Sequence, residues 1–168
     1  MKSFVRFASA TALFLSAAAL LALPELHASR AAQAAQHPAP SAEAVPAFHS
    51  APPKDALPPT MEPSLFTDIL IFNAYSVAGR EKAILYQEPC YCHCDRSQGH
   101  GSLLDCFVSR HGSGCDICQK EAFFSYEQVH HGKTAAQIRE AIIRGDWQKL
   151  DLVKYQKSYL PPSNKPIN

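Results

Sequence analysis

Six cysteines are the residues of this 168-residue chain best suited to carry chemistry, and all six lie between positions 90 and 118. Three of them alternate with other residues in Pro89-Cys90-Tyr91-Cys92-His93-Cys94, and the others are Cys106, Cys115 and Cys118. In an extended strand, side chains at alternate positions share one face, with their Cα atoms roughly 6.6 Å apart. Disulfide-bonded cysteines usually have Cα atoms about 5.5–6 Å apart. Neighbouring triplet cysteines are therefore poor partners for each other, whereas a small bend could gather all three on one metal ion.

Metal binding is the first hypothesis, because thiolates suit Zn²⁺, Cu⁺ and iron–sulfur clusters. Cys115 and Cys118 lie on one face of the first turn of a predicted helix, whose dipole stabilises thiolates. Joined to Cys92 and Cys94, they would make a four-sulfur tetrahedral zinc site. A larger set could hold more than one ion. The candidate metal ligands are Cys90, Cys92, Cys94, Cys106, Cys115, Cys118, His100 and His111, which flank Cys106, and His93, which a strictly extended triplet would point away from the sulfurs.

Two alternatives use the same cysteines. Small exported domains with six cysteines are usually held by disulfides, here with 15 possible connectivities, and the triplet would need the other three cysteines as partners. Cys115 and Cys118 also have the C-x-x-C spacing of thiol–disulfide redox proteins, but no thioredoxin-like strand–helix–strand pattern surrounds them. The sequence contains no Ser/His/Asp arrangement, phosphate-binding glycine loop or HExxH motif. We therefore expect a non-catalytic role.

The N-terminal residues 1–34 are predicted to be a signal peptide. Lys2 and Arg6 precede an apolar run over 7–23, and Ala32-Gln33-Ala34 offers a cleavage site. We expect a periplasmic or secreted protein, with membrane contact only if this segment stays uncleaved as an anchor. The formal net charge of +1 gives no reason to expect a nucleic-acid partner. The expected partner is a metal ion, either zinc or Cu(I).

The rest of the chain is predicted to be mainly α, a small helical domain with a central cysteine-rich loop or strand. Residues 35–60 are a Pro/Ala-rich, extended linker in which His49 would be isolated and solvent-exposed. The domain spans 61–160, and 161–168 are a tail. Helices are expected near 64–78, 115–131 and 135–144, with Ser64 as an N-cap, a capping box formed by Thr134 and Gln137, and Gly79, Gly132 and Gly145 as stops.

These residues resemble the bacterial PCYCGC-motif family, many of whose members are exported lipoproteins. The likeness covers roughly residues 65–145 and includes Pro89 to Cys94, Gly99-His100, Cys106, His111, Cys115, Cys118 and Gly132-Lys133. His93 stands where the motif has glycine, and the lipoprotein cysteine is absent. The resemblance supports the domain assignment and implies no activity. From the residues alone, Cys92→Ser and Cys118→Ser should lower metal content and melting temperature, and His49→Ala should change neither.

Overall fold

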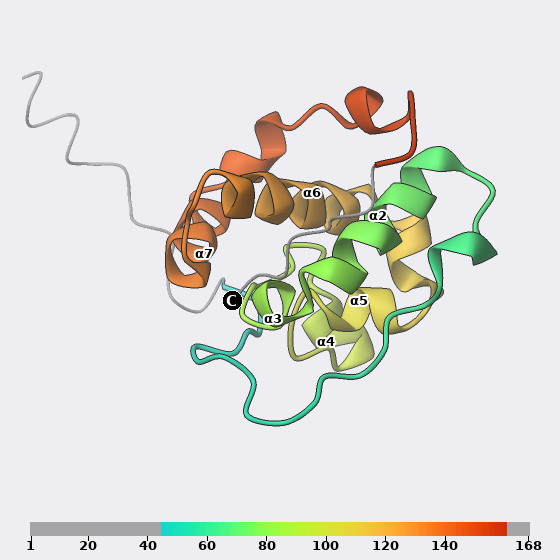
Figure 1. Cartoon of the computed structure of the whole chain (residues 1–168). Helices are drawn as coiled ribbons and strands as arrows, with labels where there is room; N and C mark the ends of the chain where they lie inside the picture. Colours follow the sequence, from blue (N-terminus) through green and yellow to red (C-terminus); the bar gives the residue numbers. More distant parts are fainter. Residues whose placement is uncertain (1–44, 161–168) are drawn as a thin grey trace, which may run out of the picture. The chain divides into compact units, whose positions relative to one another are not determined.

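The computed structural model describes residues 45–160, and helices are the regular secondary structure of that part of the chain (Figure 1). This confirms the predicted mainly α fold. The predicted signal peptide and tail lie outside the described residues. The helices are α2 (Ile69–Arg80), α3 (Lys82–Leu85), α4 (Cys94–Gln98), α5 (Asp105–Val108), α6 (Asp116–His130) and α7 (Ala135–Ile143), joined by the 3-10 turns η2 (Pro63–Leu65), η3 (Arg110–Gly114), η4 (Asp146–Lys149) and η5 (Leu152–Tyr155).

Helix α2 begins later than the sequence predicts. Its N-cap is Asp68, whose Oδ1 accepts hydrogen bonds from the backbone N–H groups of Leu70 at 2.8 Å and Ile71 at 3.2 Å. The predicted cap Ser64 instead lies in η2. Gly79 does not end the helix, which continues to Arg80. A polar residue can cap a helix only where the chain turns into that helix. Tertiary packing therefore determines whether Ser64 or Asp68 is the cap.

The ends of α6 and α7 follow the local sequence signals. Thr134 Oγ1 accepts from the Gln137 N–H at 3.3 Å, and Gln137 Oε1 accepts from the Thr134 N–H at 3.0 Å, so the predicted capping box is confirmed. Gly132 and Gly145 follow the two helices with φ of 74° and 79°, a left-handed conformation that glycine adopts without strain. The predicted helices over 115–131 and 135–144 are therefore present to within one residue at each end.

Helix α2 packs beside α6 (Figure 1). Aromatic and aliphatic side chains between the elements form the core. Tyr75 of α2 contacts Phe107 edge-to-face, with ring centroids 5.2 Å apart. Phe123 of α6 stacks on Tyr155 at 3.7 Å. Four cysteines are buried in the same cluster: Cys90, Cys94, Cys106 and Cys118. The main core therefore continues without a break into the cysteine-rich region, and its packing positions the sulfurs.

Residues 45–61 pack against the domain as an extended segment. The Ala47 N–H donates to Asp95 Oδ2 at 3.3 Å, and the Met61 N–H donates to the Phe107 carbonyl at 2.9 Å. His49 stacks on Tyr86, with ring centroids 3.9 Å apart and planes within 4°. The expectation that His49 is isolated is wrong, because aromatic contacts far along the chain hold it. His49→Ala is therefore not a neutral control, and the exposed His131 replaces it below.

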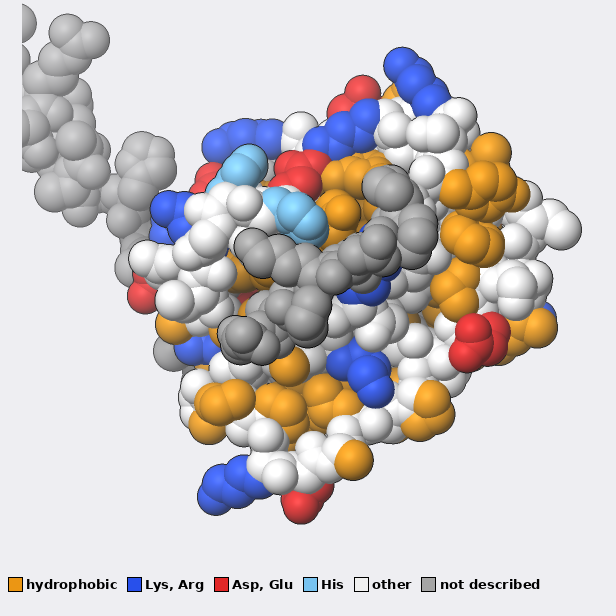
Figure 2. Space-filling model, in the orientation of Figure 1, with side chains coloured by type: hydrophobic (Ala, Val, Ile, Leu, Met, Phe, Trp, Pro, Cys, Tyr) orange, Lys and Arg blue, Asp and Glu red, His pale blue; other side chains and the backbone are white. Residues whose placement is uncertain are grey.

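Within residues 45–160, every helix falls short of the length and apolar character that a membrane span requires. On the face drawn in Figure 2, both Lys or Arg and Asp or Glu side chains are scattered among hydrophobic patches. The formal net charge of the chain is +1.

Candidate metal centre

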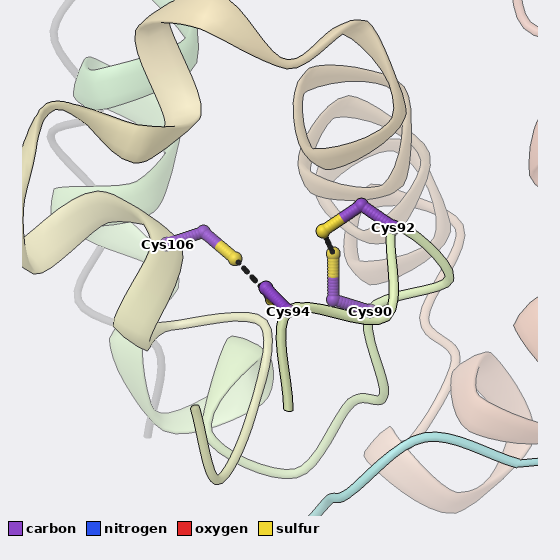
Figure 3. Close-up of side chains that lie close together, drawn as sticks. All are labelled: Cys90, Cys92, Cys94 and Cys106. Carbon is purple, nitrogen blue, oxygen red and sulfur yellow. Dashed lines mark hydrogen bonds between the residues drawn. The ribbon is translucent and has the colours of Figure 1, made fainter. Parts of the chain in front are cut away.

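The cysteine triplet forms a tight turn. The His93 N–H donates to the Cys90 carbonyl at 3.1 Å, His93 has a left-handed backbone with φ 57°, and α4 begins at the next residue, Cys94. The extended-strand interpretation is therefore wrong, although the bend that it needed for metal binding is present. The turn brings Cys90 Sγ to 3.3 Å from Cys92 Sγ (Figure 3).

Backbone hydrogen bonds align the triplet with the segment that carries Cys106. The Leu103 N–H donates to the Glu88 carbonyl at 2.9 Å, and the Leu104 N–H donates to the Leu85 carbonyl at 3.2 Å. Cys106 follows directly in α5, and its sulfur lies 3.4 Å from that of Cys94 (Figure 3). These backbone hydrogen bonds fix the two short segments against each other and do not depend on a ligand.

The third segment is the first turn of α6, which contributes Cys118. Its sulfur lies 3.5 Å from that of Cys90 and 3.6 Å from that of Cys92. The triplet and the start of this helix therefore meet, as their sequence predicted. All six cysteines lie in the described part of the chain and are free thiols, and the sulfur–sulfur distances of 3.3–3.6 Å among Cys90, Cys92, Cys94, Cys106 and Cys118 exceed the roughly 2.05 Å of a disulfide bond.

Two groups of four ligand atoms in the described residues are compact enough to hold a metal ion. One contains Cys90, Cys92, Cys94 and Cys106, and the other contains Cys92, Cys106, Cys118 and His111. Within each group all ligand atoms lie within 4.8 Å of one another. Four sulfurs bound to Zn²⁺ at about 2.3 Å would lie about 3.8 Å apart. The cysteines are therefore spaced much as a tetrahedral thiolate site requires.

The other predicted ligands have different surroundings. His111 Nε2 lies 3.6 Å from Cys92 Sγ, and His100 Nδ1 lies 3.4 Å from Cys106 Sγ, with the two imidazole rings 5.1 Å apart. His93 belongs to neither group and contacts Tyr91, with ring centroids 6.0 Å apart.

Cys115 also belongs to neither group. It is the N-cap of α6, and its sulfur accepts a hydrogen bond from the Cys118 N–H at 3.5 Å. The sequence prediction had placed it inside the first helical turn, sharing one metal ion with Cys92, Cys94 and Cys118. That combination is not one of the two compact groups.

Hydrogen bonds among the sulfurs set which thiols ionise. The thiol of Cys90 donates to Cys92 Sγ and, despite burial, lowers the pKa of Cys92 to about 4, with His111 also contributing. Hydrogen bonds from Cys118 and Cys90 lower the pKa of Cys106. The contact with Cys106 correspondingly raises the pKa values of the Cys90 and Cys118 thiols. The cluster thus combines two thiols of lowered pKa, Cys92 and Cys106, with two of raised pKa, Cys90 and Cys118.

Glu121 is a residue of this site that sequence reasoning missed. It is fully buried one turn beyond Cys118 in α6, and its Oε1 accepts from the Tyr91 N–H at 2.9 Å. Burial raises the pKa of this carboxyl well above its ordinary value. Glu121 therefore holds the triplet turn against α6. Glu121 follows Cys118 by three residues, so both lie on one face of the helix. This spacing was the sequence signal that could have placed Glu121 at the site.

The fold and the cluster define a small, mainly helical, cysteine-rich protein whose cysteines could bind a metal ion. The family model described as "Protein of unknown function with PCYCGC motif" matches residues 25–168. The chain belongs to that family, with His93 at the position of the motif's glycine. No curated protein and no solved structure matches the chain.

His93→Gly should raise the free energy of unfolding by about 0.5–1 kcal/mol. Within residues 45–160, His93 is the only residue other than glycine with positive φ, a conformation that costs an L-residue roughly 1–2 kcal/mol. Glycine removes that strain, partly offset by its greater freedom in the unfolded chain. The bound-metal content should not change, because His93 is outside both ligand groups.

Urea unfolding and metal analysis of His93→Gly and His93→Ala check this prediction. His93→Ala keeps the strained backbone and loses the contact with Tyr91, so it should be less stable than His93→Gly. A loss of bound metal in both variants would make His93 a ligand and contradict the assignment.

Proposed function

We propose that this protein is an exported, non-catalytic metal-binding protein that holds Zn²⁺ or Cu⁺ in its cysteine cluster. The observation that carries the proposal is the convergence of five sulfurs and one imidazole nitrogen into two compact four-atom groups. These atoms come from the triplet, from α5 and η3, and from the first turn of α6. Soft thiolate ligands favour these two ions over hard cations such as Mg²⁺ and Ca²⁺.

Burial of the sulfurs supports a bound ion. Cys90, Cys94, Cys106 and Cys118 are at most 2% exposed. Buried anions are costly unless a counter-charge compensates them, and a bound cation supplies that charge directly. The cost of bringing several thiolates together in the core is then offset by metal–sulfur bonds.

Full coordination supports a structural or storage role. Each group offers four protein ligands, which completes a tetrahedral ion, whereas catalytic zinc sites keep one position open for water or substrate. The proposal of export to the periplasm or the exterior relies on the signal-peptide pattern of residues 1–34.

The test is metal analysis with thiol counting on native protein purified without oxidants. We expect bound zinc or copper, and six titratable thiols after chelation and denaturation without reductant. Cys92→Ser and Cys118→Ser should lose bound metal, and His131→Ala should keep all of it. Six oxidised cysteines in the native protein would overturn the proposal and favour the alternative of a disulfide-stabilised domain.

A further inference from the structure

The two four-atom ligand groups overlap in a specific way, because both contain Cys92 and Cys106. Two tetrahedra that share two corners share an edge. A thiolate sulfur has more than one lone pair and can bind two metal ions at once. The sequence allowed more than one ion in the cluster, but it gave no reason for any particular residue to be shared.

We propose that the centre binds two Zn²⁺ ions bridged by the thiolates of Cys92 and Cys106. Cys90 and Cys94 complete the ligands of the first ion, and Cys118 and His111 complete those of the second. This inference rests on the proposed function, and it specifies the number of ions, their class and the role of each ligand.

The distances support this division of the ligands. Cys92 Sγ lies 3.3 Å from Cys90 in the first group, and 3.6 Å from both Cys118 Sγ and His111 Nε2 in the second. Cys106 Sγ lies 3.4 Å from Cys94 in the first group. Cys92 is thus in contact with ligands of both ions, as a bridging position requires.

Charge favours zinc over copper for this pair of ions. Two Zn²⁺ ions bring four positive charges against the five thiolates of the two groups, which leaves a net charge of −1. Two Cu⁺ ions would leave −3 with the same ligands. A buried centre with the smaller net charge costs less to desolvate. Zinc also takes four-coordinate tetrahedral geometry in structural sites, which is what each group offers.

Three predicted ligands lie outside both groups, and two of them, His100 and Cys115, have supporting positions. His100 Nδ1 lies 3.4 Å from Cys106 Sγ, where an N–H can donate to the bridging thiolate and orient it. Cys115 caps α6 through the Cys118 N–H, a role that serine fills well. Cys115→Ser is therefore a matched control that removes one sulfur from the region without removing a ligand.

The experiment loads the full, reduced chain with Zn²⁺ or with Co²⁺ as a spectroscopic substitute, under anaerobic conditions. Native mass spectrometry counts the ions, and electron paramagnetic resonance reports magnetic coupling between two cobalt ions through shared sulfur. We expect two ions in the wild type and in Cys115→Ser, with the cobalt signal strongly reduced by coupling when both sites are filled. His111→Ala should retain one ion, and Cys92→Ser should lose the coupling and at least one ion.

The outcomes separate this inference from the proposed function. No bound Zn²⁺ or Co²⁺ in the wild type would overturn the binuclear zinc centre, and the proposed function would fall with it if the native protein also holds no copper. A single ion would leave the proposed function standing and overturn the binuclear centre. Two ions with uncoupled cobalt signals would overturn the bridge, and loss of an ion in Cys115→Ser would overturn the ligand assignment. The number of bound ions and the magnetic coupling in the wild type test the inference even if Cys92→Ser does not fold.

Discussion

Removal of the metal with a chelator at neutral pH should lower the free energy of unfolding by about 3–5 kcal/mol, or the melting temperature by about 10–20 °C. Metal binding contributes directly to folding when the ligands come together only in the folded chain. Here the proposed ligands come from separate elements, and without an ion the low-pKa sulfurs of Cys92 and Cys106 lose the counter-charge that a cation supplies. The stacked aromatic residues between α2, α6 and η5 limit the loss, because they pack without any metal.

The loss of stability should be local at first. Helices α4 and α5 have five and four residues, too short to be stable without tertiary contacts. Hydrogen exchange of the apoprotein should therefore accelerate over 90–115, while α6, with 15 residues, keeps its protection. Uniform loss of protection in both regions would contradict this view of the centre.

Thermal unfolding followed by circular dichroism, with reductant and without oxygen, measures the effect. Re-addition of Zn²⁺ should restore the original melting temperature, and Mg²⁺ should not, since it prefers oxygen ligands. Identical unfolding curves for the loaded and stripped protein would show that the cluster does not depend on metal for its stability.

Local signals in the sequence predicted some elements accurately. The capping box at Thr134 and the left-handed glycines at 132 and 145 involve only neighbours within a few residues, so the helix ends that they define were predictable. The start of α2 was not predictable in this way, because Asp68 and Ser64 can both cap a helix and only packing distinguishes them.

The sequence predicted which residues belong to the site better than it predicted how they are arranged. The spacing of the cysteines predicted that the triplet would meet the start of α6. The alternation rule that suggested an extended triplet failed at His93, where a left-handed residue closes the turn. The sharing of Cys92 and Cys106 between two groups depends on distances across the fold, as do the contacts of His49 with Tyr86 and of Glu121 with Tyr91.

Gly112→Ala should destabilise the protein by about 1–3 kcal/mol, since an added methyl group overpacks a filled core. Gly112 is buried in η3, and a Cβ atom there would lie 2.9 Å from Phe107 Cε1 and 3.1 Å from the Cys106 carbonyl oxygen. The backbone at Gly112 needs no positive φ, so the effect is steric. We expect the clash to shift Phe107 and Cys106, which join the aromatic core to the cysteine cluster, and to move the neighbouring proposed ligand His111.

Gly114→Ala is the matched control, because it lies in the same 3-10 turn and its Cβ would meet nothing within 4 Å. A surface change of this kind should alter stability by less than about 0.5 kcal/mol. Urea unfolding of the reduced, metal-loaded variants measures the difference, and zinc titration against a chelator of known affinity measures the second ion. Gly112→Ala should weaken zinc binding at the ion that His111 completes, since a ligand moved by a few tenths of an ångström loses its bonding geometry. Equal stability and equal zinc affinity in the two alanine variants would contradict the close contact between η3, Phe107 and the metal centre.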